Sequence, residues 1–336
     1  MTRLSVLAAC ISFAGVAGAA AQARGNAPPP PAFTDSSPHR SYYIEGHARL
    51  DCLDWGGDGP PLVMVHDLGD SPHIFDDLAN QLRGKYHLYA YARRGHGRSS
   101  SPVAPYDDLT LLDDLRGVLE DLRLKHTSLL GWGFGGDEIT AYAVKYPDRV
   151  DKIIYLDAGY DWSTTSFYKP FQKVLSANTP SATVVKSLDS LRAWYQEAWL
   201  GSVPWTNGLE AYLRDVAHLD EEGHPQPVPN PMVFGALFTT MGGWRRDYKK
   251  VQAPTLALYA STYYPTERKN PALSQQLREF EQNTMVPFRR ESIERIQKEL
   301  RHVTVRELPN RTHMSIGIAA PDSLAAIISD FLGTPP

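Results

Sequence analysis

Continuous apolar runs alternate with amphipathic stretches along most of the chain. Runs of this kind are typical of strands buried on both faces of a parallel sheet: 61–66, 86–92, 127–132, 150–156 and 254–259. The stretches between and after them space their apolar residues as helices do: 74–82, 108–124, 135–146, 292–300 and 321–332. Residues 42–55 are expected to form two short strands with a turn at Gly46, and residues 302–308 form the last strand. This alternation predicts an α/β fold, with a mostly parallel, doubly wound sheet.

The pattern changes between about residues 161 and 248, where strand-like runs disappear and aromatic residues accumulate. Most of the seven tryptophans lie there: Trp162, Trp194, Trp199, Trp205 and Trp244. We therefore expect one core, built from residues 41–160 and 251–336, with a helical lid at 161–250. The lid would cover the carboxyl edge of the sheet, where open α/β sheets bind ligands.

The first residues have the features of a targeting segment. Arg3 precedes an uncharged apolar run that ends in small residues, which predicts a signal peptide at 1–23. A membrane anchor and lipidation at Cys10 are the alternatives. Residues 24–40 contain four consecutive prolines and are expected to form a Pro-rich tether. The protein is therefore expected to be secreted or periplasmic, without stable membrane insertion after signal cleavage.

Composition narrows the function classes. The 336 residues are 42% hydrophobic and 21% charged, which excludes a disordered, collagen-like or coiled-coil chain. The net charge of −4 lacks the basic excess of a dedicated nucleic-acid binder. The loop from His218 to His224 is expected to be solvated rather than a metal site, and no cofactor or metal is predicted.

The segment from Leu130 to Gly136 is the most informative one. It follows a strand and opens a helix, and its glycines allow the close backbone approach that a sharp turn requires. A nucleophile elbow reads G-x-S-x-G in this context. The spacing is kept here, but the central residue is Gly133.

With this elbow, the chain resembles the α/β-hydrolase superfamily, in its lidded form, over nearly all of residues 40–334. Val65–Asp70 is similar to the H-G-x-x-G oxyanion loop, with Asp67 in place of a glycine. Arg94–Ser99 matches the R-G-x-G-x-S loop, and Arg311–Met314 stands where the family keeps its catalytic histidine. The resemblance implies the α/β-hydrolase fold.

The resemblance offers more than one position for the catalytic acid. The usual position follows the strand at 255–259, but no carboxylate occurs there before Glu267. A branch of the superfamily that includes several haloalkane dehalogenases places the acid after the preceding strand, where Asp157 stands. Asp157 is the first choice, Asp161 the second and Glu267 the third.

The resemblance also implies the roles of the site residues. His313 would act as base, Asp157 would orient it, and the backbone N–H groups of Leu68 and Phe134 would form an oxyanion hole. Gly133 has no group with which to attack, so the gap would hold a water that His313 activates.

The surroundings of the elbow suggest where a substrate would lie. Trp132 and His66 are expected to border the pocket, although His66 and His96 also fit a scaffolding role. The lid aromatics favour an apolar substrate.

Two functions remain open. One is hydrolysis of a small apolar ester, amide or lactone by a triad without serine. The other is a catalytically inactive protein that binds a small molecule or another protein. Dehalogenase and epoxide-hydrolase chemistry is not expected, because it needs a carboxylate at the elbow.

Overall fold

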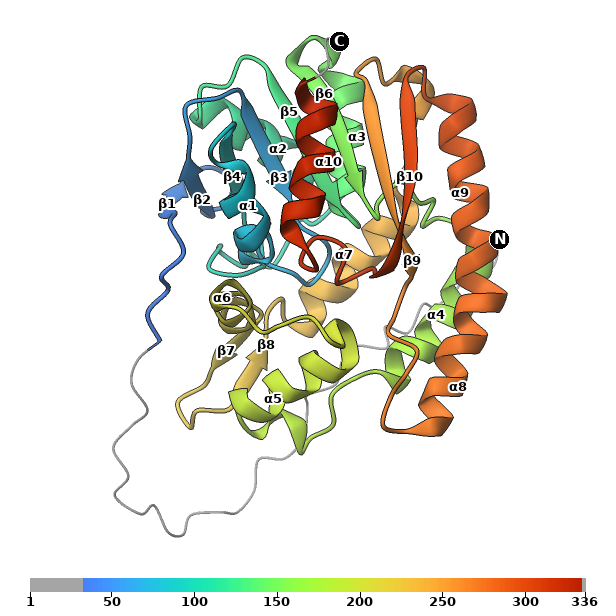
Figure 1. Ribbon diagram of the computed structural model, residues 1–336. Coiled ribbons are helices and arrows are strands. Elements are labelled where there is room, and N and C mark those ends of the chain that lie inside the picture. The colour runs from blue at the N-terminus through green and yellow to red at the C-terminus, as the bar shows by residue number, and fades with distance from the viewer. Residues whose placement is uncertain (1–32, 334–336) are drawn as a thin grey trace.

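The centre of the computed structural model, which describes residues 33–333, is an eight-stranded sheet (Figure 1). Its strands are β1 (Arg40–Ile44), β2 (Leu50–Gly56), β3 (Pro61–Val65), β4 (His87–Tyr91), β5 (Thr127–Trp132), β6 (Val150–Leu156), β9 (Thr255–Thr262) and β10 (Val303–Thr312). They lie in the order β1-β2-β4-β3-β5-β6-β9-β10. β2 pairs antiparallel with β1 and β4, and the other pairs are parallel. The predicted α/β fold with a mostly parallel sheet is confirmed.

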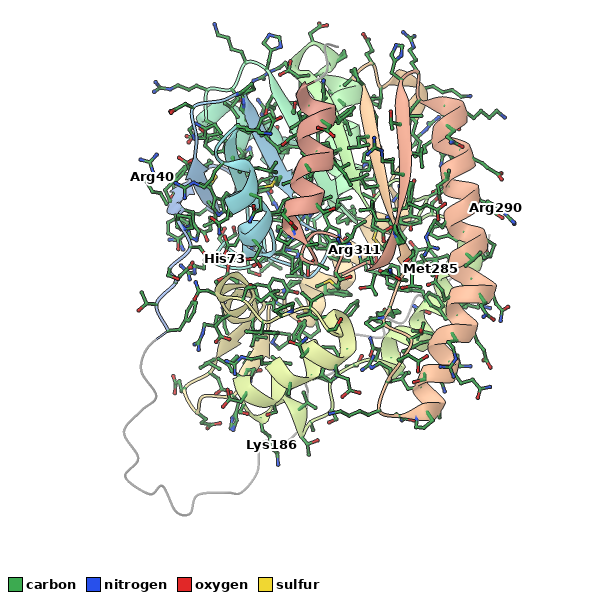
Figure 2. All side chains as sticks on the ribbon, in the orientation of Figure 1. Arg40, His73, Lys186, Met285, Arg290 and Arg311 are labelled. Carbon is green, nitrogen blue, oxygen red and sulfur yellow. The ribbon has the colours of Figure 1, made fainter. Side chains whose placement is uncertain are left out.

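Helices cover both faces of the sheet, because successive strand residues point to opposite sides. On one face, the helices α1 (Asp76–Leu82) and α10 (Pro321–Gly333) pack on a layer that includes Leu62 and Met64. On the other face, the helices are α2 (Asp108–Asp121), α3 (Gly135–Lys145) and α9 (Val286–Glu299). Side chains fill the space between these layers, and Arg40 and Arg290 mark opposite sides of the molecule (Figure 2).

The segment between β6 and β9 lies across the carboxyl ends of the strands (Figure 1). It consists of α4 (Thr165–Ala177), α5 (Leu188–Tyr195), α6 (Asn207–Val216), β7 (Ala217–Leu219), β8 (Pro225–Pro227) and α7 (Pro231–Gly243). The antiparallel pair β7–β8 corrects the expectation that this segment contains no strands. Three-residue strands carry too little alternation to be recognised in a sequence.

A helix before α9 also differs from the sequence expectation. α8 (Pro271–Phe280) continues through residues 281–285 into α9, which begins at Val286 rather than at Ser292. Asn270 caps α8 by accepting hydrogen bonds from the N–H groups of Ala272 and Leu273. An Asn-Pro pair at a helix start is a readable signal, which the apolar pattern alone did not reveal.

The predicted signal peptide, 1–23, lies outside the described residues, and so do residues 24–32 of the predicted tether. The described end of the tether contacts the folded chain. The guanidinium of Arg214 lies 4.9 Å from the centre of the Phe33 ring, and Ser37 Oγ donates a hydrogen bond to Asp76. No helix within residues 33–333 is both long and apolar enough to span a membrane.

Candidate active site

A sharp turn joins β5 to α3, as the sequence predicts. A Cβ atom on Gly135 would lie 2.2 Å from the carbonyl oxygen of Val65, and one on Gly131 would lie 2.6 Å from the backbone of Gly135. Gly133 has φ +51, a conformation that side chains rarely adopt. The turn therefore has the geometry of a nucleophile elbow, without a side chain at its tip.

The carboxylate of Asp67 lies where the side chain of residue 133 would project. A Cβ atom on Gly133 would lie 2.1 Å from Asp67 Cγ. Asp67 Oδ1 accepts a hydrogen bond of 2.5 Å from the N–H of Phe134, and Asp67 Oδ2 lies 2.8 Å from His313 Nε2. Asp67 follows β3, which pairs with β5, so the two loops meet at one edge of the sheet.

This carboxylate at the elbow was not predicted from the sequence. Asp67 departs from the family pattern in one loop and Gly133 in another, far apart along the chain. The missing side chain at residue 133 and the added one at residue 67 are complementary, and that complementarity was the available signal. The elbow residue itself is glycine, as the sequence shows, but residue 67 brings a carboxylate to the elbow from another loop.

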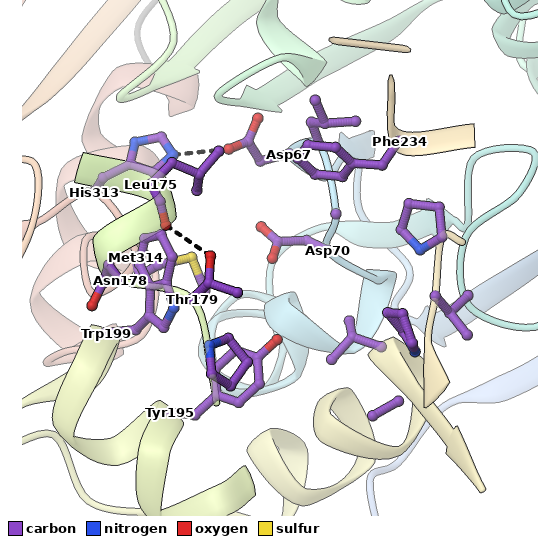
Figure 3. A pocket seen from close by; sticks show the side chains of 18 of the residues that line it. Asp67, Asp70, Leu175, Asn178, Thr179, Tyr195, Trp199, Phe234, His313 and Met314 are labelled. Atoms are coloured by element: carbon purple, nitrogen blue, oxygen red, sulfur yellow. Dashed lines mark hydrogen bonds and ion pairs between the residues drawn. The ribbon is translucent and has the colours of Figure 1, made fainter. Parts of the chain in front are cut away.

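His313 is held between two carboxylates. Its Nε2 faces Asp67 (Figure 3), and its Nδ1, on the other side of the ring, lies 2.7 Å from Asp157 Oδ2. Tyr160 and the N–H of Ala260 donate hydrogen bonds to the other oxygen of Asp157. The ring of Tyr263 stacks on His313 at 4.5 Å between centres. These contacts fix the position and the plane of the imidazole.

The other candidate acids lie elsewhere. Asp161 forms ion pairs with Arg246 and Arg295, and Glu267 pairs with Arg278 at the surface. Of the three positions weighed from the sequence, the structure brings only Asp157 to His313.

The environment of His313 favours its charged form. Burial opposes the imidazolium, but hydrogen bonds and charge from Asp157 and Asp67 outweigh burial and raise the pKa of His313 to about 10. His313 is therefore protonated at neutral pH. A protonated imidazole cannot accept a proton from water, so the resting site does not fit the expected activation of water by His313.

A buried arginine holds the loop that carries Asp67. Arg93 donates to the carbonyl oxygens of His66 and Asp67, and its Nε lies 2.5 Å from Glu138. The N–H of Arg93 also donates to His66 Nε2, while His66 Nδ1 contacts the carbonyl oxygen of Asp67. His96 Nε2 accepts a hydrogen bond from the N–H of Gly69. Both histidines therefore hold backbone groups, and burial lowers the pKa of each.

A cavity of about 180 Å³ lies between these loops and the segment that follows β6. Aromatic residues form much of its wall: Trp162, Phe171, Trp194, Tyr195, Trp199, Tyr212, Phe234, Phe238 and Tyr263. Asp67, Asp70 and His313 place polar groups in it (Figure 3). The site can therefore hold a small, largely apolar molecule against Asp67.

Two residues expected at the pocket lie outside its lining. Trp132 is fully buried and packs beside Phe75 and under Gly317, where a Cβ atom would lie 2.5 Å from the indole. His66 is also fully buried and is bound to backbone groups. Of the expected oxyanion donors, Leu68 lines the pocket, whereas the N–H of Phe134 is already bound to Asp67.

Asp70 is a second buried carboxylate in the pocket. Its Oδ1 accepts a hydrogen bond of 2.8 Å from Tyr212, and its Oδ2 has no hydrogen-bond partner within the described residues. Burial and the nearby charge of Asp67 raise the pKa of Asp70 to about 7. Both its protonation states are therefore accessible near neutral pH.

Comparison with known proteins supports the fold. Residues 60–178 match a family described as alpha/beta hydrolase fold. The chain is 30% identical over 101 residues to 2-(acetamidomethylene)succinate hydrolase of Mesorhizobium japonicum, covering 30% of this chain and 36% of that protein. It is 36% identical over 106 residues to a human serine hydrolase-like protein, covering 31% and 52%. The matched regions thus span between about a third and a half of these relatives.

A solved structure agrees over a longer stretch. The crystal structure of E-2-(acetamidomethylene)succinate hydrolase superposes with a TM-score of 0.65 at 17% identity, covering 88% of this chain and all of that one. Of the two relatives named above, one is called a hydrolase and the other serine hydrolase-like. The strand order, the elbow and this superposition together establish that the chain has the α/β-hydrolase fold.

Proposed function

We propose that the protein is a hydrolase of a small apolar compound and that the Asp67 carboxylate is its nucleophile. One observation carries the proposal: Asp67 lies at the elbow with one oxygen on the N–H of Phe134 and the other beside His313. An attacking Oδ2 would leave Oδ1 as the carbonyl oxygen of an ester. Oδ1 already accepts a hydrogen bond from the N–H of Phe134, which would stabilise the negative charge that forms on Oδ1 when water attacks the ester.

The charges favour an epoxide as the substrate class. Asp67 Oδ2 would attack one ring carbon, and the C–O bond would break with its electron pair on the ring oxygen. Protonated His313 would give its proton to that oxygen, leaving a hydroxyalkyl ester on Asp67. Loss of the Asp67 charge lowers the pKa of His313, which becomes the base for the next step.

In the second step, water would attack Cγ of Asp67 and give one proton to His313. The ester C–O bond would then break, and the alcohol would leave with the second proton of the water. Asp67 would again be ionised and His313 protonated. The sum is epoxide plus water to diol.

Labelling with ¹⁸O from water tests this mechanism directly. Wild-type enzyme in excess over styrene oxide or 1,2-epoxyhexane, in H₂¹⁸O, should acquire ¹⁸O in the Asp67 carboxylate. Asp70, a carboxylate in the same pocket, is the internal control and should stay unlabelled in fragment spectra. His313→Gln should lose both turnover and labelling of Asp67, because a neutral amide can neither protonate the ring oxygen nor activate water. Turnover with label only in the diol would refute nucleophilic attack by Asp67.

A second function is favoured by the same contact. The Phe134 N–H that an ester hydrolase would use for its oxyanion is occupied by Asp67, and glycine stands at the nucleophile position. A protein that binds a small apolar molecule without turnover would have these features. In that case, neither the epoxides nor p-nitrophenyl butyrate would be hydrolysed above the uncatalysed rate. Substitution of Asp67 or His313 would not change that rate.

The place of action is a separate proposal. We propose export from the cytoplasm, on the basis of the expected signal peptide alone. N-terminal sequencing of the mature protein should begin near residue 24.

A further inference from the structure

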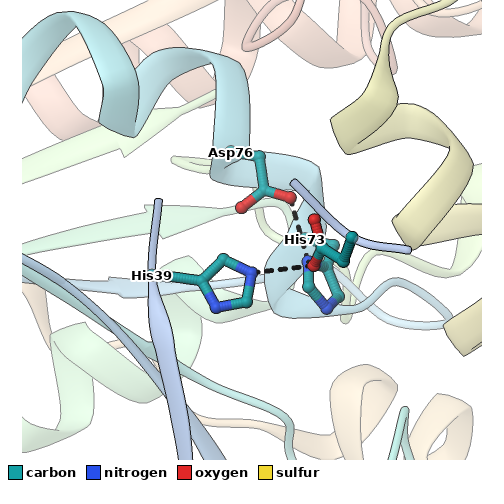
Figure 4. Close-up of side chains that lie close together, drawn as sticks. His39, His73 and Asp76 are labelled. Atoms are coloured by element: carbon teal, nitrogen blue, oxygen red, sulfur yellow. Dashed lines mark hydrogen bonds and ion pairs between the residues drawn. The ribbon is translucent and has the colours of Figure 1, made fainter. Parts of the chain in front are cut away.

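Two histidines and two aspartates converge beside the amino end of α1, away from the pocket. Asp35 and His39 belong to the segment before β1, and His73 lies in the short 3₁₀ helix Pro72–Phe75 that leads into Asp76 and α1 (Figure 4). One ligand atom from each lies within 4.8 Å of the other three. None of the four residues lines the active-site cavity.

The facing atoms have the chemistry of metal ligands. His39 Nε2 lies 2.9 Å from Asp35 Oδ2, and His73 Nδ1 lies 2.9 Å from Asp76 Oδ2 and 3.7 Å from Asp35 Oδ2. Ligands of a tetrahedral ion with bonds of about 2.0–2.1 Å stand roughly 3.4 Å apart. These three distances lie within about half an ångström of that spacing.

The outer oxygen of each carboxylate is held by other groups. Asp76 Oδ1 accepts a hydrogen bond from Trp55 Nε1, and Asp35 Oδ1 accepts one from the N–H of Ser37. Each aspartate therefore keeps its Oδ2 turned toward the histidines. Such outer hydrogen bonds orient the ligands of a metal site.

The far side of His73 adds an independent observation. Asp215 on α6 is 1% exposed, and its Oδ2 has no hydrogen-bond partner within the described residues. This oxygen lies 3.6 Å from His73 Nε2. A carboxylate behind the second ring nitrogen of a ligating histidine is a common arrangement, because it fixes the tautomer that leaves the first nitrogen free for the metal.

Negative charge is in excess around His73. The carboxylates of Asp35, Asp76 and Asp215 surround it, and Arg98 pairs with Asp215 at 3.3 Å. A divalent cation would balance the two aspartates whose oxygens face the histidines. Two imidazoles and two carboxylates suit zinc better than the hard cations calcium and magnesium, which prefer oxygen ligands alone.

We propose that Asp35, His39, His73 and Asp76 form a structural zinc site. The ion would join three parts of the molecule: the described end of the predicted tether, the turn after the Asp67 loop, and, through Asp215, helix α6. Gly208 supports the approach of α6, since a Cβ atom there would lie 2.7 Å from Asp76 Cβ.

A second group of possible ligands does not share these features. Asp220, Glu222 and His224 lie exposed on the turn between β7 and β8. Hydrogen bonds within the turn account for Asp220, since its oxygens accept from the N–H groups of Glu222 and His224 and from Gln226.

The test uses the full chain, freed of metal by chelation and titrated with Zn²⁺ in a calorimeter. One Zn²⁺ per chain is expected. The melting temperature should rise by roughly 5 °C at a hundredfold excess over Kd and fall again with EDTA. His39→Ala and Asp35→Asn, both at the margin of the fold, should each weaken binding at least about tenfold.

His87→Ala is the matched control. His87 Nε2 also lies 2.9 Å from an aspartate, Asp54, but within residues 33–333 it belongs to no group of three or more possible metal ligands. This variant should bind Zn²⁺ as the wild type does. Absence of saturable binding would overturn the proposal. Binding that survives His39→Ala and Asp35→Asn, or that is lost in His224→Ala instead, would also overturn it. These results do not depend on hydrolase activity.

Discussion

Gly133→Ser is expected to destabilise the protein unless Asp67 is removed with it. A Cβ atom at residue 133 would lie 2.1 Å from both Cγ and Oδ1 of Asp67, so the carboxylate must leave its place. Gly133→Ser and Asp67→Gly then lose the same two contacts, to the N–H of Phe134 and to His313. At about 1.5 kcal/mol for each charge-assisted bond, the shared loss is about 3 kcal/mol. The serine at φ +51 adds roughly 1 kcal/mol of backbone strain.

Urea unfolding of the wild type, the two single variants and the double variant measures this coupling. The double variant should be about 3 kcal/mol more stable than the sum of the single changes predicts, because the shared contacts are lost once rather than twice. Hydrolysis of p-nitrophenyl butyrate through a serine is expected in the double variant and not in Gly133→Ser alone. Additivity within about 0.5 kcal/mol would refute the conclusion that Asp67 fills the place of the missing side chain.

Three further predictions concern buried charges. His313 has a pKa of about 10, above its ordinary 6.5, so its stabilising contribution is complete below pH 6.5 and is lost as the pH rises through 10. Urea unfolding at successive pH values should show the wild type losing stability relative to His313→Gln by up to about 1.4 kcal/mol per pH unit in that window. A difference in unfolding free energy that does not change with pH would contradict the ion pairs of His313 with Asp157 and Asp67. Asp70 has a pKa raised to about 7, so the wild type should lose stability relative to Asp70→Asn as the pH rises from about 4 to 7. Above pH 7, the difference in the free energy of unfolding between the two proteins should stay constant. Arg93→Met leaves Glu138 buried without its partner and should cost about 3–5 kcal/mol in denaturant unfolding, a loss that adding Glu138→Gln should partly reverse; an equal loss in both variants would exclude the unpaired charge as the cause.

The core of the fold could be predicted because its signals are local. Strands buried on both faces are continuous apolar runs, as at 61–65 and 150–156, and a sharp elbow needs glycine wherever backbone meets backbone. Order along the chain then placed Asp157 and His313 at the same edge of the sheet, and the structure brings them within 2.7 Å.

The rest of the site depends on side chains that are distant in sequence. Asp67 reaches the elbow only because residue 133 leaves room for it, and neither residue shows this alone. His39 and His73 are likewise separated by more than thirty residues, and their approach depends on how the segment before β1 packs. The β7–β8 pair was missed for another reason, since its strands are too short to show a period.

The two halves of the pocket come from different stretches of the chain. Asp67, Asp70 and His313 belong to loops of the sheet, whereas most of the aromatic wall lies in the contiguous segment between β6 and β9. Exchange of that one segment with a homologue would therefore alter which molecules fit while leaving the reacting groups in place. Recombination at two junctions, near residues 161 and 250, would thus give new selectivity without rebuilding the chemistry.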